Sequence, residues 1–154
     1  MSGNAPEIDL RQLPNARVAI ISSSWHLDIC NDLVAGAERA LAAASIKNVE
    51  VIYVPGSFEI PLASQIAFEK GFDAVVAVGL VLEGETPHFD YVCQGVTQGV
   101  MDVSLKFSAP IGFGVLMCNT LDQAVARSGR PGSSEDKGHD SAVAAIKLLQ
   151  LKEG

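Results

Sequence analysis

Apolar runs recur along the chain and predict strands, and the unbroken run Ala74–Leu82 predicts a strand that is buried on both faces. Such strands are typical of parallel sheets, in which helices cover both sides. The expected strands are Arg17–Ser22, Val49–Val54, Ala74–Leu82 and Ile111–Met117. A further segment, Glu7–Leu10, is too short to assign, and it fits either a loose arm or an extra edge strand, including one on a neighbouring chain.

Helical patterns fill the intervals between these runs. Pro61 must lie in the first turn of its helix, and Thr120 with Gln123 resembles a capping box whose short helix Gly129 would close. The expected helices are Leu27–Ala44, Phe58–Lys70, Pro87–Phe107, the short helix after Thr120, and about Lys137 to Leu151. This alternation predicts an α/β three-layer sandwich, with a four-stranded parallel sheet, right-handed crossovers and helices on both faces.

Composition narrows the class of protein. With 154 residues, 48% of them apolar, residues 1–154 are expected to form one domain with a proper core. The net charge of −7 argues against nucleic acid or an anionic membrane as partner. No apolar run approaches the roughly 20 residues that span a bilayer, and no signal peptide is visible. Three widely spaced cysteines predict free thiols in a cytoplasmic protein and no structural metal site.

Four loops carry polar and aromatic residues where the predicted strands end. Because the carboxyl ends of parallel strands share one edge of a sheet, these loops should cluster there, where α/β proteins bind ligands. Their glycine-rich turns match neither a P-loop nor a dinucleotide fingerprint. The loops are Ser22–His26, Pro55–Glu59, Glu83–His88 and Cys118–Asn119.

His88 is the strongest catalytic candidate. Thr86 followed by Pro87 is a helix-start signal, so His88 should lie in the first turn of a helix. Unpaired N–H groups at a helix start can bind an anion, and a histidine exchanges protons near neutral pH. A surface or capping histidine is an equally good interpretation of this residue alone. His26 is interpreted as structural, and no role is assigned to His139.

Other candidate residues each have a plain structural alternative. Trp25, the only tryptophan, is either a lid over the sheet edge or a stacking platform for a flat heterocycle. Glu59 is either an acidic residue that the helix dipole stabilises at a helix start, or an acceptor of hydrogen bonds from sugar-like hydroxyls. Arg127 suits the end of a helix, and Lys137 follows two acidic residues with which it can pair.

Two long motifs carry a family resemblance. Residues 54–61 (VPGSFEIP) and 84–92 (GETPHFDYV), followed by residues 126–129 and 136–138, strongly resemble the 6,7-dimethyl-8-ribityllumazine synthases. The likeness covers nearly the whole chain from about residue 15, and the loop at 130–137 most resembles actinobacterial members. It implies a flavodoxin-like fold and the penultimate step of riboflavin biosynthesis. In that step 5-amino-6-(D-ribitylamino)uracil condenses with 3,4-dihydroxy-2-butanone 4-phosphate to give 6,7-dimethyl-8-ribityllumazine, phosphate and water, without a metal or redox cofactor.

The resemblance also implies roles for individual residues. His88 would transfer protons, Arg127 would bind the phosphate beside backbone N–H groups at residues 84–86, and Trp25 would stack on the pyrimidine. Ser57 and Glu59 would hold the ribityl chain. The full set of implied substrate-binding residues is Trp25, Ser57, Phe58, Glu59, Val81, Leu82, Gly84, Glu85, Thr86, Phe113, Arg127 and Lys137.

In this family the site lies between two subunits of a pentamer. Phe113, Arg127 and Lys137 would therefore come from the neighbouring chain. Pentamers of the family occur free, paired into decamers, or closed into a shell of sixty chains. The loop at 129–138 looks long for a shell-forming member, so a free pentamer is expected. Riboflavin synthase is a separate candidate partner.

Two departures from the family pattern bear on the site. Glu83 stands where Arg or Lys is common, which should weaken phosphate binding. Ala126 stands where some members have Glu, so Arg127 lacks an orienting partner on its own helix. Two other functions remain: a non-enzymatic flavin or lumazine carrier, and a flavodoxin-like electron carrier, for which residues 22–24 (SSS) offer a faint phosphate loop.

Overall fold

The chain builds one parallel sheet at its centre. The computed structural model describes residues 3–8 and 12–154. Its strand order, β2-β1-β3-β4, leaves β2 and β4 at the edges. The strands begin and end within one residue of the predicted positions: β1 Arg17–Ser23, β2 Asn48–Val54, β3 Ala74–Leu82 and β4 Ile111–Cys118.

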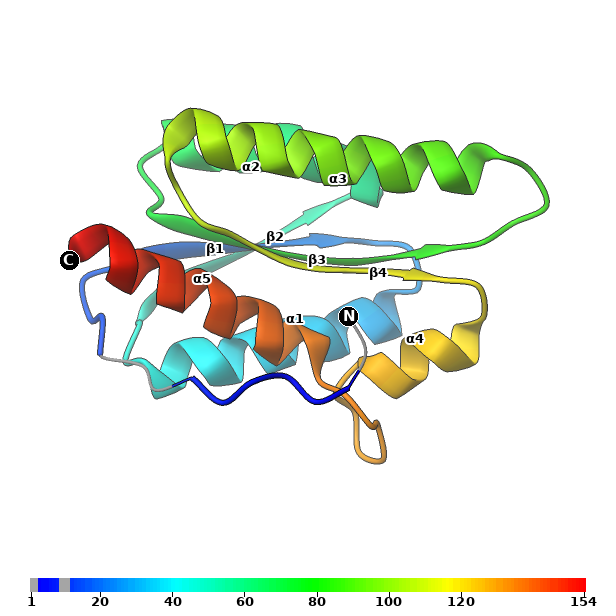
Figure 1. Ribbon diagram of the computed structural model, residues 1–154, viewed down its shortest axis with the longest axis horizontal. Coiled ribbons are helices and arrows are strands. Elements are labelled where there is room, and N and C mark those ends of the chain that lie inside the picture. Colours follow the sequence, from blue (N-terminus) through cyan, green and yellow to red (C-terminus); the bar gives the residue numbers. More distant parts are fainter. Residues whose placement is uncertain (1–2, 9–11) are drawn as a thin grey trace.

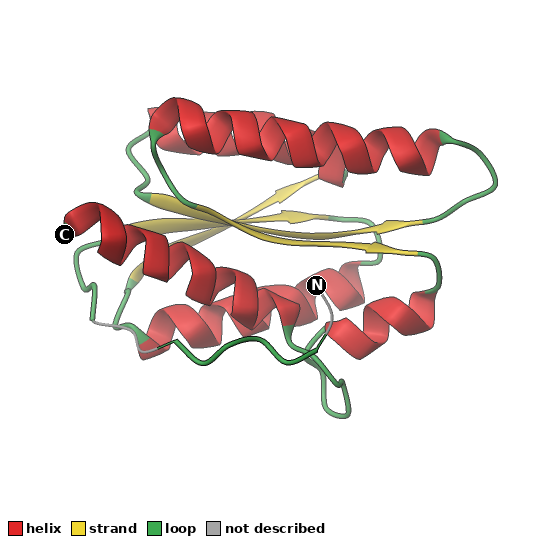
Figure 2. Cartoon of the chain, in the orientation of Figure 1, coloured by secondary structure: helices red, strands yellow, loops and turns green. Residues whose placement is uncertain are grey.

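Helices cover both faces of this sheet. One face is covered by three helices, α1 Leu27–Ala43, α4 Leu121–Arg127 and α5 Lys137–Glu153. The other face is covered by the 3₁₀ turn η1 Ser57–Glu59 and the helices α2 Ile60–Glu69 and α3 His88–Phe107 (Figures 1 and 2). This is the predicted three-layer α/β sandwich of the flavodoxin-like type, with parallel pairing throughout.

Two helix starts differ from the prediction. The expected helix Phe58–Lys70 is split, because η1 precedes α2 and Pro61 then occupies the first turn of α2. The third helix begins at His88 rather than at Pro87, which is its N-cap. The short segment Glu7–Leu10 forms no strand at residues 7 and 8, and its last two residues lie outside the described residues.

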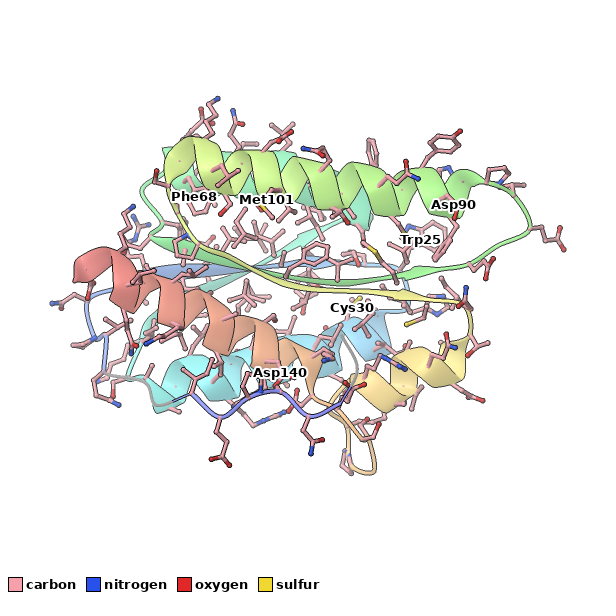
Figure 3. The ribbon with its side chains drawn as sticks, in the orientation of Figure 1. Trp25, Cys30, Phe68, Asp90, Met101 and Asp140 are labelled. Atoms are coloured by element: carbon pink, nitrogen blue, oxygen red, sulfur yellow. The ribbon has the colours of Figure 1, made fainter. Side chains whose placement is uncertain are left out.

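Apolar stripes face the sheet as the periodicity predicts. In α1 the residues spaced by four are buried, namely Ile29, Leu33, Ala37 and Leu41. In α3 the middle of the valine stripe is buried, while its ends at Val92 and Phe107 are half-buried because they lie near the ends of the helix. The side chains fill both spaces between the layers (Figure 3). Within the described residues, no helix is long and apolar enough to cross a membrane.

Two glycines allow α1 and α5 to approach closely. A Cβ atom at Gly138, in the first turn of α5, would lie 2.0 Å from the carbonyl oxygen of Leu33 in α1. A Cβ at Gly36 would lie 2.4 Å from the carboxylate of Asp136. Asp136 also accepts a hydrogen bond from Arg39 of α1 at 2.6 Å. The start of α5 is therefore fixed against α1.

Candidate functional site

A cleft of about 830 Å³ opens at the carboxyl ends of β1, β2 and β3. The chain leaves β1 towards β2 on one side, whereas β3 lies on the other, so this is the switch point of the sheet. Three of the four predicted loops converge here; the loop at Cys118–Asn119 does not line the cleft. The lining residues are Trp25, His26, Gly56, Ser57, Phe58, Glu59, Leu80, Val81, Leu82, Gly84, Thr86, His88, Phe89, Tyr91 and Val92.

Trp25 presents an open indole ring at one wall of the cleft. It follows β1 and is 68% exposed (Figure 3). The Trp25 backbone is fixed to α1, because the Cys30 thiol donates a hydrogen bond to the Trp25 carbonyl at 3.2 Å. His26, the N-cap of α1, has a left-handed backbone with φ 54°. The structure thus fixes the strand-to-helix turn while leaving the ring free to meet a ligand.

Ser57 brings a buried hydroxyl to the second loop of the cleft. Its side chain is 4% exposed, and within the described residues its Oγ has no hydrogen-bond partner. The hydroxyl lies above Gly79 of β3, where a Cβ would come within 3.0 Å of it. Next to it, the Phe58 ring packs against Gly95 of α3, and Glu59 is exposed. The loop therefore offers an unsatisfied hydroxyl beside a free carboxylate.

The segment Gly84–His88 forms the opposite wall. Within the part of the chain that the structure describes, the N–H groups of residues 84–86 donate no hydrogen bond. A Cβ at Gly84 would meet no atom within 4 Å, so the surrounding fold leaves open space there. His88 is exposed, and its N–H lies 3.4 Å from the Thr86 hydroxyl that accepts from it. Glu85, another predicted site residue, does not line the cleft. Free donors and an exposed imidazole thus lie side by side.

Besides Glu85, three predicted site residues lie outside the cleft of their own chain. Phe113 is on the edge strand β4 and is 42% exposed. Arg127 ends α4 and Lys137 begins α5, and both helices lie on the opposite face of the sheet from α3 (Figure 1). Lys137 pairs with one of the acidic residues before it, as expected: its Nζ lies 3.1 Å from Glu135 Oε1.

Arg127 has orienting partners, contrary to the expectation from Ala126. Its Nη1 donates to the carbonyl oxygen of Gln123 at 2.8 Å, and its Nε lies 3.5 Å from Glu135 Oε2. The bridging role of Glu135 was missed from the sequence, where acidic residues near a lysine indicated only a local pair. Gln123 also completes the predicted capping box with Thr120.

The three cysteines are free, as predicted. Burial raises the pKa of Cys30, Cys93 and Cys118 above that of an ordinary thiol. The thiols therefore stay protonated at neutral pH, where a protonated thiol is a poor nucleophile. Among the described residues, no group of three or more His, Cys, Asp or Glu side chains could hold a metal ion.

The fold and the cleft are those of an α/β protein with a cleft of small-molecule size at the switch point of its sheet, lined by an exposed indole, an unsatisfied hydroxyl and an exposed histidine. The model of the family "6,7-dimethyl-8-ribityllumazine synthase" matches residues 15–153. The chain belongs to this family.

The chain is similar in sequence to curated relatives over almost the whole length of each. The chain is 51% identical to the 6,7-dimethyl-8-ribityllumazine synthase of Streptomyces coelicolor over 95% of this chain and 91% of the relative. It is 51% identical to that of Pseudarthrobacter chlorophenolicus, over 95% and 94%, and 48% identical to that of Kocuria rhizophila, over 95% of each. These organisms are actinobacteria, which confirms the predicted resemblance to actinobacterial members of the family.

Proposed function

We propose that this cleft is where the protein performs the reaction of its family. It condenses 5-amino-6-(D-ribitylamino)uracil with 3,4-dihydroxy-2-butanone 4-phosphate, giving 6,7-dimethyl-8-ribityllumazine, phosphate and water. The observation that carries the proposal is the convergence of Trp25, Ser57 and His88 on one cleft. Imine formation and loss of phosphate need two oriented substrates, a proton shuttle and an anion site. The cleft supplies the first two requirements from one chain.

Each wall of the cleft is assigned to one part of the substrates. The Trp25 indole stacks on the pyrimidine, beside backbone from Val81 and Leu82. The ribityl chain lies along residues 57–59, where a ligand hydroxyl satisfies the buried Ser57 Oγ. His88 carries a proton from the attacking amine to the carbonyl oxygen, which leaves as water, and then takes a carbon-bound proton next to the imine as phosphate leaves. The free N–H groups at residues 84–86 receive the phosphate oxygens.

The cation for that phosphate comes from a second copy of the chain. Arg127, Lys137 and Phe113 do not line the cleft of their own chain, and Phe113 lies on an open edge strand. Large apolar side chains are exposed on α2 and α3, as expected of a surface that another subunit covers. They include Leu62, Tyr91, Met101 and Leu105. We favour a free pentamer over a decamer or a shell of sixty chains.

Sedimentation velocity tests the assembly directly. A pentamer has a mass of about 81 kDa, five times the 16.2 kDa of one chain. A particle near a megadalton would contradict the pentamer. Four further points stay predictions. Residues 1–154 would form a single domain, and residues 1–15 an arm that pairs with a neighbour. The location would be cytoplasmic, and riboflavin synthase would be a partner.

Lumazine absorbance after mixing both substrates tests the function, with His88→Ala as the key variant. We expect the variant to lose about 100-fold in kcat, because general acid–base groups contribute that much or more. Measurable activity should persist, since the substrates remain positioned. His139→Ala is the matched control, because His139 lies in α5, away from the cleft. Full activity in His88→Ala would remove His88 from the mechanism.

Two other functions have less support. A flavin or lumazine carrier needs Trp25 and the cleft but no turnover, so the same assay separates it from the enzyme. An electron carrier needs a phosphate loop after β1. Ser22 and Ser23 are fully buried within β1, and the Ser22 hydroxyl donates to the Ser23 carbonyl. Those hydroxyls are not free to bind a phosphate.

A further inference from the structure

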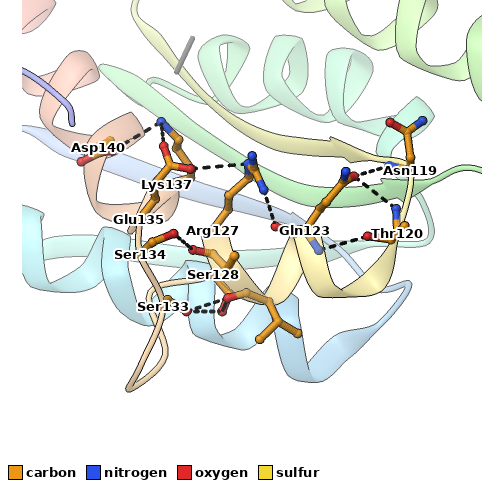
Figure 4. A network of polar contacts seen from close by, with 12 residues as sticks. Asn119, Thr120, Gln123, Arg127, Ser128, Ser133, Ser134, Glu135, Lys137 and Asp140 are labelled. Atoms are coloured by element: carbon orange, nitrogen blue, oxygen red, sulfur yellow. Dashed lines mark hydrogen bonds and ion pairs between the residues drawn. The ribbon is translucent and has the colours of Figure 1, made fainter. Parts of the chain in front are cut away.

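We infer that Glu135 is a positioning residue that holds Arg127 and Lys137 together as one anion-binding pair. The inference rests on the proposed function, in which Arg127 binds the substrate phosphate. The two cations belong to different helices, and they would repel each other if nothing lay between them. Glu135 bridges them: its Oε2 lies 3.5 Å from Arg127 Nε and its Oε1 lies 3.1 Å from Lys137 Nζ (Figure 4).

The backbone fixes Glu135 beside the end of α4. Its N–H donates to the carbonyl oxygen of Ala126 at 3.0 Å, and its own carbonyl accepts from the N–H of Gly129 at 3.1 Å. Ser128 and Asp136 form an antiparallel bridge on either side of the loop. Gly129 has φ 79°, a left-handed conformation that suits glycine. The carboxylate therefore starts from an anchored position.

Side chains of the loop that carries Glu135 also donate hydrogen bonds to the end of α4. The Ser133 hydroxyl donates to the Val125 carbonyl at 2.6 Å, and the Ser134 hydroxyl donates to the Ala126 carbonyl at 3.2 Å. Both acceptors are in the last turn of α4, where carbonyl groups lack partners within the helix. Residues 129–135 are thus closed onto the helix that ends in Arg127.

Burial makes the bridge stronger than an ordinary surface pair. The Glu135 side chain is 18% exposed and that of Lys137 is 24% exposed, whereas that of Arg127 is 41% exposed. Water screens such a pair less than a fully exposed one. Glu135 Oε1 is buried and has no hydrogen-bond partner among the described residues, so the Lys137 ammonium meets it as a charge. Within the same residues Nη2 of Arg127 meets no acceptor, so it can donate to a ligand.

Positioning and simple electrostatics predict opposite outcomes for Glu135→Gln. Removal of the negative charge makes the site more positive, so electrostatics alone predicts tighter binding of an anion. If Glu135 positions the cations, the variant releases both of them and binding weakens. A purely structural role would instead lower the melting temperature and change the KM of both substrates alike.

The experiment uses the full-length, assembled protein and inorganic phosphate as the probe. We expect Glu135→Gln to raise the KM for the butanone phosphate, and the inhibition constant of inorganic phosphate, by about fivefold or more. The KM for the pyrimidine substrate should stay unchanged. Glu135→Asp keeps the charge and should recover part of the loss. Phosphate binding as tight as in the wild type, or tighter, would overturn the inference.

Asp140→Asn is the matched control. This variant removes a negative charge from the same neighbourhood, since the Asp140 carboxylate lies 3.8 Å from Lys137 Nζ. Among the described residues, no ion pair or hydrogen bond joins Asp140 to Arg127. Burial raises the pKa of the Asp140 carboxyl, with Lys137 and His139 acting in the opposite direction. We expect this variant to bind phosphate at least as tightly as the wild type. Weakened binding equal to that of Glu135→Gln would overturn the inference.

A crystal structure of Glu135→Gln separates this inference from the proposed function. A displaced Arg127 guanidinium supports positioning, and an unmoved one overturns it, whether or not the protein makes lumazine. If the wild type makes no lumazine, the proposed function fails while the structure still decides the role of Glu135.

Discussion

At the scale of residues, the cleft combines backbone that is fixed with side chains that are left unsatisfied. The Trp25 carbonyl is bonded by the Cys30 thiol, yet the indole is mostly exposed. Ser57 Oγ is buried without a partner. Both features cost free energy in the unliganded protein, because exposed apolar rings and unpaired buried hydroxyls are unfavourable. A ligand that covers the ring and bonds the hydroxyl recovers that cost.

Ser57→Ala should therefore affect stability and binding in opposite directions. Removal of an unsatisfied hydroxyl should stabilise the free protein by up to about 1 kcal/mol. The KM for the ribityl substrate should rise by roughly tenfold, since a hydrogen bond to the ligand is lost. Thermal melting and steady-state kinetics measure the two effects.

Ser64→Ala is the control for Ser57→Ala. The Ser64 hydroxyl is fully buried too, but it donates to the Ile60 carbonyl at 2.8 Å. Its removal should destabilise the protein by about 1 kcal/mol and leave KM unchanged. Destabilisation of Ser57→Ala to the same extent would show that its hydroxyl is satisfied within the fold.

Trp25 also makes ligand stacking directly observable. It is the only tryptophan, so all tryptophan fluorescence reports on the cleft. We expect riboflavin to quench it, because the wide indole gains roughly 1 kcal/mol from stacking on a flat ring. Ribitol, which has the side chain but no ring, should leave the emission unchanged. Weak or absent quenching by riboflavin would count against the stacking platform.

At the scale of elements, the sequence pattern predicts which segments form strands and helices better than how they begin. Apolar runs located all four strands. β1 and β3 are buried along most of their length, whereas the edge strand β2 is half-buried, with Glu50 and Tyr53 exposed. Pro61 lies in the first turn of α2 as predicted, but the expected bound at Phe58 was two residues early, because the 3₁₀ turn η1 occupies residues 57–59. The contact of Gly138 with Leu33 was not predicted either, because spacing along one helix says nothing about which helix crosses it.

Gly138→Ala should destabilise the protein although alanine favours helices. In an open helix the change would stabilise by roughly 1 kcal/mol. Here the new Cβ would lie 2.0 Å from a backbone oxygen of α1, so the helices must separate, at a cost of about 2–3 kcal/mol. Chemical denaturation measures the change.

Gly84→Ala is the comparison for this helix crossing. A Cβ at Gly84 meets no atom within 4 Å, and the backbone there is not left-handed. Its stability should stay within about 0.5 kcal/mol of the wild type, while the KM for the butanone phosphate rises because the methyl group crowds the anion site. Equal melting of both variants would contradict the close crossing of α1 and α5.

At the scale of the whole molecule, one chain holds two halves of a site that do not meet. The residues of the cleft are local to three loops, so the pattern of strand ends could predict their convergence. Arg127 and Lys137 could not be placed by that argument, because they lie on the opposite layer of the sandwich. Only the family resemblance suggested that a neighbouring chain brings them to the cleft.

Mixed assemblies test whether the site is shared between chains. His88→Ala and Arg127→Ala chains should each be impaired alone. When they are co-expressed in equal amounts, a shared site is intact wherever His88 comes from one variant and Arg127 from the other. Random mixing makes about a quarter of all sites intact, the product of two probabilities of one half. Activity should therefore rise to about a quarter of that of the wild type. If both residues served the same chain's cleft, no mixed assembly would contain an intact site, and the activity would stay at the average of the two variants.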